Sequence, residues 1–292
     1  MEIYWNYRYI CRKIIIIRMQ SHFKIAATAL ALGCLTPQLS AQSYFDLVGD
    51  ADKAISEGKW QSAEDLLTEA IESQPLNPSN ILLLSNLGIV RYNLGKDSLA
   101  IATLDEAHRR APVSVTVLSN RAQVLTAMGR DKDAYADYSR IIELDSTLIE
   151  PRYMHAIMAL RQDEFDKSLE DCKALEQLSP EAQETQIAYA SYYSATEQWE
   201  NAIPYYTAIL EKTPSTEMYA ARAVCYLMLQ RLNEASADIT SGLELNPEDG
   251  ELYLYRAYLN KMRYMNEDAR ADLTKAIRLG IDRKRAMQLI AE

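Results

Sequence analysis

The sequence has few of the side chains that metal binding and nucleophilic catalysis use. It contains four Cys and three His in 292 residues, and after residue 41 the remaining His are His108 and His155. No His pair has the spacing of metal ligands on one helix. A Cys-x-x-Cys pair, a Gly-rich phosphate loop and a Gly-x-Ser-x-Gly turn are also missing from the sequence. We therefore expect no metal, no cofactor and no catalytic site; an enzyme with an unrecognised site is the alternative class.

Basic residues are fewer than acidic ones. Lys and Arg number 31 against 41 Asp and Glu, which gives a formal net charge of −10. Nucleic-acid binding normally uses a basic surface, so an acidic chain argues against it. The same charge argues against docking on anionic membranes. The composition therefore favours protein or peptide partners, and partners with basic character in particular.

Residues 1–41 differ from the rest of the chain. They carry five basic residues and one acidic residue, so that without them the formal net charge falls from −10 to −14. An apolar run from Ile25 to Leu35 is followed by the small residue Ala41, a layout typical of a secretory signal peptide. The run is shorter than the roughly 20 residues that span a bilayer as a helix. We expect cleavage after Ala41 and export to the periplasm. Met19 is a better start than Met1, which would make residues 1–18 an upstream extension.

Cys34 supports an alternative to this processing. The segment Ala31 to Cys34 partly resembles a lipoprotein box, in which the Cys becomes a lipidated N-terminus. The protein would then be a membrane-anchored lipoprotein that acts as an assembly factor in the cell envelope. In neither case do we expect the mature chain itself to insert into a membrane.

Small residues recur along the rest of the chain with a period near 34. The first set is Ala51, Gly88, Ala122, Ala156, Ala190, Ala223 and Ala257. The second set follows 12 residues after each member of the first: Ala63, Ala100, Ala134, Ser168, Ala202, Ala235 and Ala269. Two small sites per period predict stacked helical hairpins, because small side chains let neighbouring helices approach closely.

The repeating units resemble tetratricopeptide repeats. Counted from the start of each unit, small residues stand at positions 8 and 20, large ones at position 24, and Pro at position 32 in five units. The resemblance implies an all-α, right-handed superhelical solenoid of about seven hairpins within residues 42–283. Its units would be 44–77, 81–114, 115–148, 149–182, 183–215, 216–249 and 250–283, with a C-terminal capping helix over 284–292. Cys172 and Cys225 then lie two units apart, too far for a disulfide.

Positions 7 and 23 change together from unit to unit. Arg121, Arg222 and Arg256 stand at position 7 where Asp137, Asp238 and Asp272 stand at position 23, whereas Tyr189 is matched by Tyr205. In an antiparallel hairpin these positions are equally far from the turn. We therefore predict partly buried ion pairs that fix the hairpin register.

The resemblance also implies where a partner would bind. In this family the first helix of each unit lines the concave groove with positions 2, 5, 6, 9, 12 and 13. The candidate protein-binding residues are Tyr92, Asn93, Asn120, Gln123, Tyr153, Ile157, Arg161, Ser191, Met228, Tyr258 and Met262. Aromatic residues and Met at these positions suit an adaptable binding surface. The expected function is a non-catalytic scaffold for protein–protein interaction; the oligomeric state is left open.

The signal-peptide interpretation predicts the mass of the mature protein. Intact mass spectrometry of protein from the cell envelope should show a chain that begins at or close to Gln42. A diacylated fragment that begins at Cys34 would instead establish the lipoprotein alternative, and an uncleaved chain would contradict both.

Overall fold

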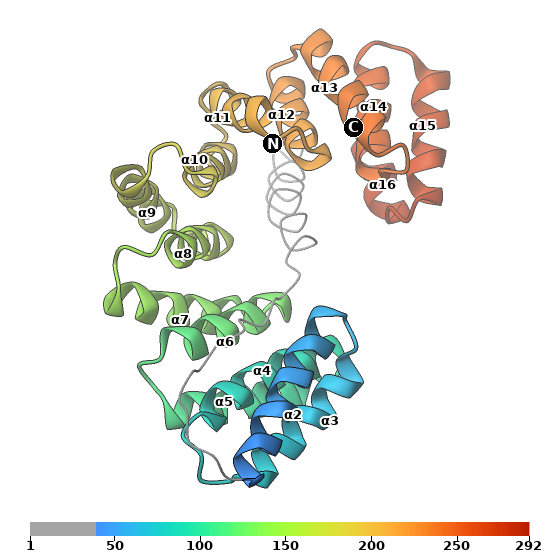
Figure 1. The fold of residues 1–292 in the computed structure, drawn as a ribbon. Helices are drawn as coiled ribbons and strands as arrows, with labels where there is room; N and C mark the ends of the chain where they lie inside the picture. Colours follow the sequence, from blue (N-terminus) through green and yellow to red (C-terminus); the bar gives the residue numbers. More distant parts are fainter. Residues whose placement is uncertain (1–38, 292) are drawn as a thin grey trace. The chain divides into compact units, whose positions relative to one another are not determined.

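The computed structural model describes residues 39–291, whose chain folds into helices alone (Figure 1). The described residues form two compact units, one ending at Met158 and the other beginning at Ala159. The expected signal segment lies outside the described residues up to position 38, as do Met19 and Cys34. The first helix begins at Leu39, so it includes the last three residues before the expected cleavage site.

The helices follow one another as pairs joined by short turns. In the first unit they are α2 (Leu39–Ser56), α3 (Trp60–Ser73), α4 (Asn80–Asn93), α5 (Asp97–Arg110), α6 (Val115–Ala127) and α7 (Asp131–Leu144). The boundary between the units falls within α8 (Ile149–Arg161). The second unit continues with α9 (Phe165–Leu178), α10 (Gln183–Ala195), α11 (Trp199–Lys212), α12 (Thr216–Met228), α13 (Leu232–Leu245), α14 (Gly250–Met262), α15 (Asn266–Arg278) and α16 (Arg283–Ala291).

The small residues of the sequence pattern lie where the two helices of a hairpin meet. All residues at positions 8 and 20 are buried, and so are the larger residues at position 24, among them Leu104, Tyr138 and Tyr206. At Gly88 a Cβ atom would collide with the side chain of Leu104 on the partner helix. The prediction of closely packed helical hairpins from small-residue spacing is therefore confirmed.

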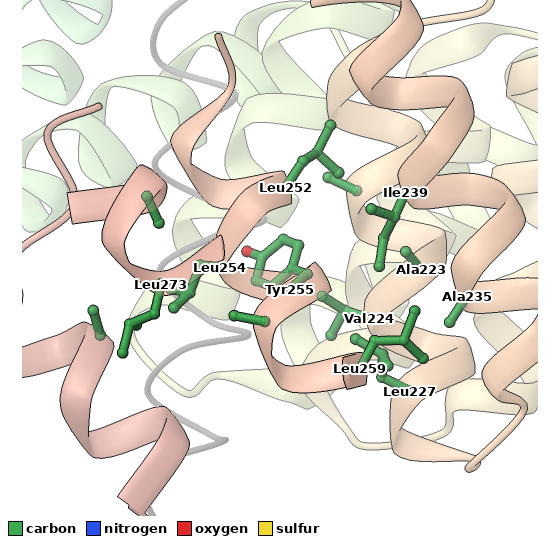
Figure 2. Packing of buried hydrophobic residues seen from close by; sticks show 14 residues of the cluster. Ala223, Val224, Leu227, Ala235, Ile239, Leu252, Leu254, Tyr255, Leu259 and Leu273 are labelled. Atoms are coloured by element: carbon green, nitrogen blue, oxygen red, sulfur yellow. The ribbon is translucent and has the colours of Figure 1, made fainter. Parts of the chain in front are cut away.

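Successive hairpins also pack on one another within each unit. In the second unit, α14 packs on α12, α13 and α15. Figure 2 shows Leu252 and Leu259 of α14 on the side of Ile239 and Leu227, while Leu254 lies on the side of Leu273. Each hairpin thus completes the core of the one before it, as expected of a repeat array.

Each hairpin turns through one residue with positive φ. The first three turns use Gly58, Gly95 and Gly129, which reach this conformation without steric cost. The last four turns use residues with side chains, at φ angles of 58–63°: Asp163, Glu197, Gln230 and Tyr264. In all seven turns the following amide donates to a carbonyl oxygen five residues earlier, as from Lys96 to Arg91 at 2.9 Å. This bond closes the end of each first helix in a Schellman motif.

The predicted register pairs are present in three hairpins. Arg222 donates through Nε and Nη2 to both carboxylate oxygens of Asp238, at 2.8 and 2.7 Å. The bidentate pairs Arg121–Asp137 and Arg256–Asp272 repeat this geometry. The Asp residues are only 4–7% exposed. Arg222 also donates to Thr207 of the preceding hairpin, so the same side chain links neighbouring repeats.

Two polar residues at position 11, where the family pattern has a large side chain, join the same networks. Arg91 donates to Glu64 of the preceding hairpin at 3.1 Å and to Thr103 of its own at 2.6 Å. Asn260 donates to Asp272 at 3.0 Å. Both residues therefore have buried or half-buried hydrogen-bond partners, which explains why the array accommodates them.

The last helix covers the end of the array. Asp282 accepts a hydrogen bond from the amide of Arg285 and so caps α16 at its N-terminus. Ala286 is fully buried in the core cluster of the second unit. Arg285 pairs with both carboxylate oxygens of Glu251 on α14. A short helix thus occupies the place where the next hairpin would begin.

The register pairs predict a strong energetic coupling. Replacing Asp238 by Ala should lower the free energy of unfolding by about 3–5 kcal/mol, because it leaves a partly buried guanidinium without its carboxylate. A double-mutant cycle of Arg222 and Asp238, followed by urea unfolding, measures the coupling. The exposed pair Arg140–Glu143 is the control, with an expected coupling of about 1 kcal/mol or less. Coupling near zero at Arg222–Asp238 would contradict the register role.

Candidate functional site

The candidate residues lie on one face of the first helices of the hairpins. We call this the A-face; it comprises repeat positions 2, 5, 6, 9, 12 and 13 of α4, α6, α8, α10, α12 and α14. The first unit contains Tyr92, Asn93, Asn120, Gln123, Tyr153 and Ile157, and the second unit contains Arg161, Ser191, Met228, Tyr258 and Met262. Each unit thus presents its own part of the A-face.

Seven of the eleven candidates are accessible to solvent. Asn93 is exposed, and the others are half-buried: Tyr92, Gln123, Arg161, Met228, Tyr258 and Met262. Tyr92 packs beside Ile89 and Val124, and burial followed by the charge of Asp97 raises the pKa of its hydroxyl. The accessible part of the A-face therefore combines aromatic rings, thioethers and amides, a chemistry suited to contacts with peptides.

Four candidates are buried. Asn120, Tyr153, Ile157 and Ser191 are 5, 6, 2 and 1% exposed. Asn120 donates to the hydroxyl of Ser85 on α4 at 3.0 Å, so its amide joins the first helices of two neighbouring hairpins. The packing of α6 against α4 accounts for this burial. Asn120 therefore contributes to the stability of the array in this structure.

Three accessible candidates of the second unit share one apolar neighbourhood. Met228, Tyr258 and Met262 pack against the buried cluster that includes Val224, Leu254 and Ala286. One side of each of the three residues thus contacts the core, while part of its surface faces solvent. Such side chains are held in place before any partner binds, which lowers the entropy cost of association.

A glutamate stands at position 2 in each of the last four units: Glu150, Glu184, Glu217 and Glu251. Glu251 is paired with Arg285 of α16, with side chains that are 17 and 28% exposed. Its negative charge is thus neutralised within the chain. A cation of a partner would have to displace Arg285 to use Glu251.

The cysteines do not have the surroundings of catalytic thiols. Cys172 and Cys225 are both buried and free. Burial raises the pKa of each thiol to about 12, so neither forms the reactive thiolate at neutral pH. Within residues 39–291, no three His, Cys, Asp or Glu side chains gather as metal ligands would. Of the helices described there, none combines the length and the apolar character that a bilayer crossing requires.

Comparisons with known proteins are consistent with the repeat pattern. No protein-family model matches the sequence. Chicken DnaJ homolog subfamily C member 3 is 26% identical over 222 residues, which cover 68% of this chain and 44% of the relative. The mouse protein of the same name is 24% identical over 215 residues, covering 66% of this chain and 43% of the relative. The chain thus spans less than half the length of these curated relatives.

Solved structures are similar over most of the described chain. A tetratricopeptide repeat protein from Parabacteroides merdae superposes with a TM-score of 0.73 at 23% identity, covering 86% of this chain and 98% of that protein. PilF of Pseudomonas aeruginosa has a TM-score of 0.61 at 15% identity, covering 75% of this chain and 99% of PilF. At these identities the likeness concerns the fold.

Two asparagines of the A-face, one buried and one exposed, test which A-face positions stabilise the fold. Asn120→Ala should lower the free energy of unfolding by about 1–3 kcal/mol, because it leaves the buried hydroxyl of Ser85 without its donor. Asn93→Ala, at an exposed site, should change it by no more than about 0.5 kcal/mol. Urea unfolding of the two variants compares them directly. Equal effects of the two substitutions would show that burial does not distinguish them.

Proposed function

Because the chain has the tetratricopeptide-repeat fold, we propose that it is a non-catalytic scaffold that binds a protein or peptide through the accessible A-face. The main support is the position of Tyr92, Met228, Tyr258 and Met262, which are half-buried on first helices and present large side chains to solvent. Tyr is enriched among residues that dominate binding energy, and Met adapts to varied partner surfaces. Within each unit, these side chains pack against buried neighbours that hold them in place.

We also propose that the protein works outside the cytoplasm, after export and cleavage near Gln42. The basic, apolar and small-residue order of residues 1–41 supports this step. The formal net charge of −14 that would remain supports a partner with basic character, since opposite charges accelerate encounter at low salt. Two buried thiols with raised pKa values support a binding role over thiol catalysis.

A peptide library tests the A-face directly. A phage-displayed library of random dodecapeptides is selected against the full chain, and the affinities of the selected peptides are then measured by fluorescence anisotropy. The double variants Asn93→Ala/Gln123→Ala and Met228→Ala/Met262→Ala should weaken binding by about tenfold or more in the unit whose face the peptide uses. Selected peptides should also be rich in Lys and Arg.

Variants on second helices are the controls. Glu72→Ala on α3 and Glu244→Ala on α13 change exposed residues and should leave affinity within about twofold. Circular dichroism melting confirms that each variant is folded. If the selected peptides bind both A-face variants with full affinity, the proposed binding surface is wrong.

A further inference from the structure

Four tyrosines of the second unit form a cluster around α10. Tyr189 and Tyr205 stack with ring centroids 5.1 Å apart, and Tyr193 lies 6.0 and 5.7 Å from them. Tyr192 meets Tyr193 edge to face at 5.4 Å. Tyr189 is buried, whereas the other three rings are half-buried and reach solvent. We call these four residues the tyrosine cluster.

A carboxylate lies at the rim of the tyrosine cluster. The hydroxyl of Tyr189 donates to Oε2 of Glu176 at 2.8 Å, and Glu176 is an exposed residue of α9. Burial, followed by the interaction with Glu176, raises the pKa of Tyr189, so its hydroxyl stays protonated as a donor. This bond occupies one carboxylate oxygen, and Oε1 is available for a second donor.

In the sixth and seventh hairpins a position-7 arginine of the chain itself lies beside a tyrosine ring. Arg222 at position 7 lies 5.9 Å from the ring centroid of Tyr226, and Arg256 lies 4.9 Å from that of Tyr253. Lys275 also lies 5.7 Å from the ring of Tyr253. The fifth hairpin has Tyr189 at position 7 instead. In the described chain no Lys or Arg lies over the rings of the tyrosine cluster.

We propose that the tyrosine cluster and Glu176 bind an arginine or lysine side chain of a protein partner. Ring faces attract a cation through their quadrupole, and Glu176 supplies the opposite charge and a hydrogen-bond acceptor. The planar guanidinium fits best, because it stacks on a ring and donates in the same plane. The net negative charge of the chain favours the approach of such a partner.

This surface is separate from the A-face. Glu176 and Tyr205 belong to second helices, α9 and α11, and Tyr189 stands at position 7, outside the A-face positions. A partner could therefore occupy the tyrosine cluster while a peptide occupies the A-face. The proposal does not depend on the A-face being a binding site.

A matched pair of labelled peptides tests the proposal. One alternates Gly and Arg over eight residues; in the other, citrulline replaces Arg and removes the charge while keeping the shape. The full chain should bind the arginine peptide at least threefold more tightly, as measured by fluorescence anisotropy at 0.05 M salt. Tyr193→Leu and Glu176→Gln should each weaken binding of the arginine peptide by about three- to tenfold. Glu176→Lys, which places a cation beside the rings, should remove the preference for arginine.

The controls separate this site from general attraction to an acidic protein. Glu244→Gln on α13 makes the same change of charge at another exposed position and should leave affinity unchanged. Glu176 is exposed, so its variants should fold, and circular dichroism checks this. Equal binding of the two peptides, or equal weakening by Glu176→Gln and Glu244→Gln, would overturn the proposal.

Discussion

The close approach of the two helices in each hairpin is the contact from which the rest of the array is built. It depends on a residue with little or no side chain at position 8, opposite a large residue at position 24. Gly88 and Leu104 show how tight this contact is, because even a methyl group on Gly88 would collide with the leucine. With this spacing fixed, a guanidinium at position 7 reaches the carboxylate at position 23 and a hydroxyl of the preceding hairpin. Packing within a hairpin and register between hairpins therefore follow from the same few positions.

The sequence predicted the hairpins well because their determinants are local and repeated. Small residues 12 positions apart and glycine at the first three turns identify the helices, and paired changes at positions 7 and 23 identify the ion pairs. The accessibility of the A-face was harder to predict. Asn120 stands at a groove position of the family, yet it is buried because its amide meets Ser85 of the adjacent hairpin. Whether such a position is accessible depends on a side chain of the neighbouring repeat, which the pattern of a single unit does not specify. The tyrosine cluster was visible in the sequence only as the matched residues Tyr189 and Tyr205.

Charge is distributed unequally between the two kinds of helix. Among the first helices, α2 contains three acidic residues, α4 and α6 contain none, and α8, α10, α12 and α14 contain one each, at position 2. Most acidic residues of the described helices therefore lie on second helices, among them Glu176 at the rim of the tyrosine cluster. On the A-face the acidic residues stand at position 2, and one of them, Glu251, is paired with Arg285. The two surfaces thus differ in chemistry: the A-face combines apolar and amide side chains with the position-2 glutamates, whereas the tyrosine cluster places aromatic rings beside one carboxylate.

The hairpin turns of the first unit differ from those of the second in the residue that adopts positive φ. All four turns with a side chain at positive φ belong to the second unit, and all three hairpin turns with glycine belong to the first. A side chain in the left-handed conformation costs roughly 1–2 kcal/mol, and in a repeat array such costs remain with the repeat that bears them. Hydrogen bonds at the turns of the second unit should therefore open more often than those of the first. Local opening should therefore be more frequent in the second unit than in the first, so that the two units differ in local stability although they share one fold.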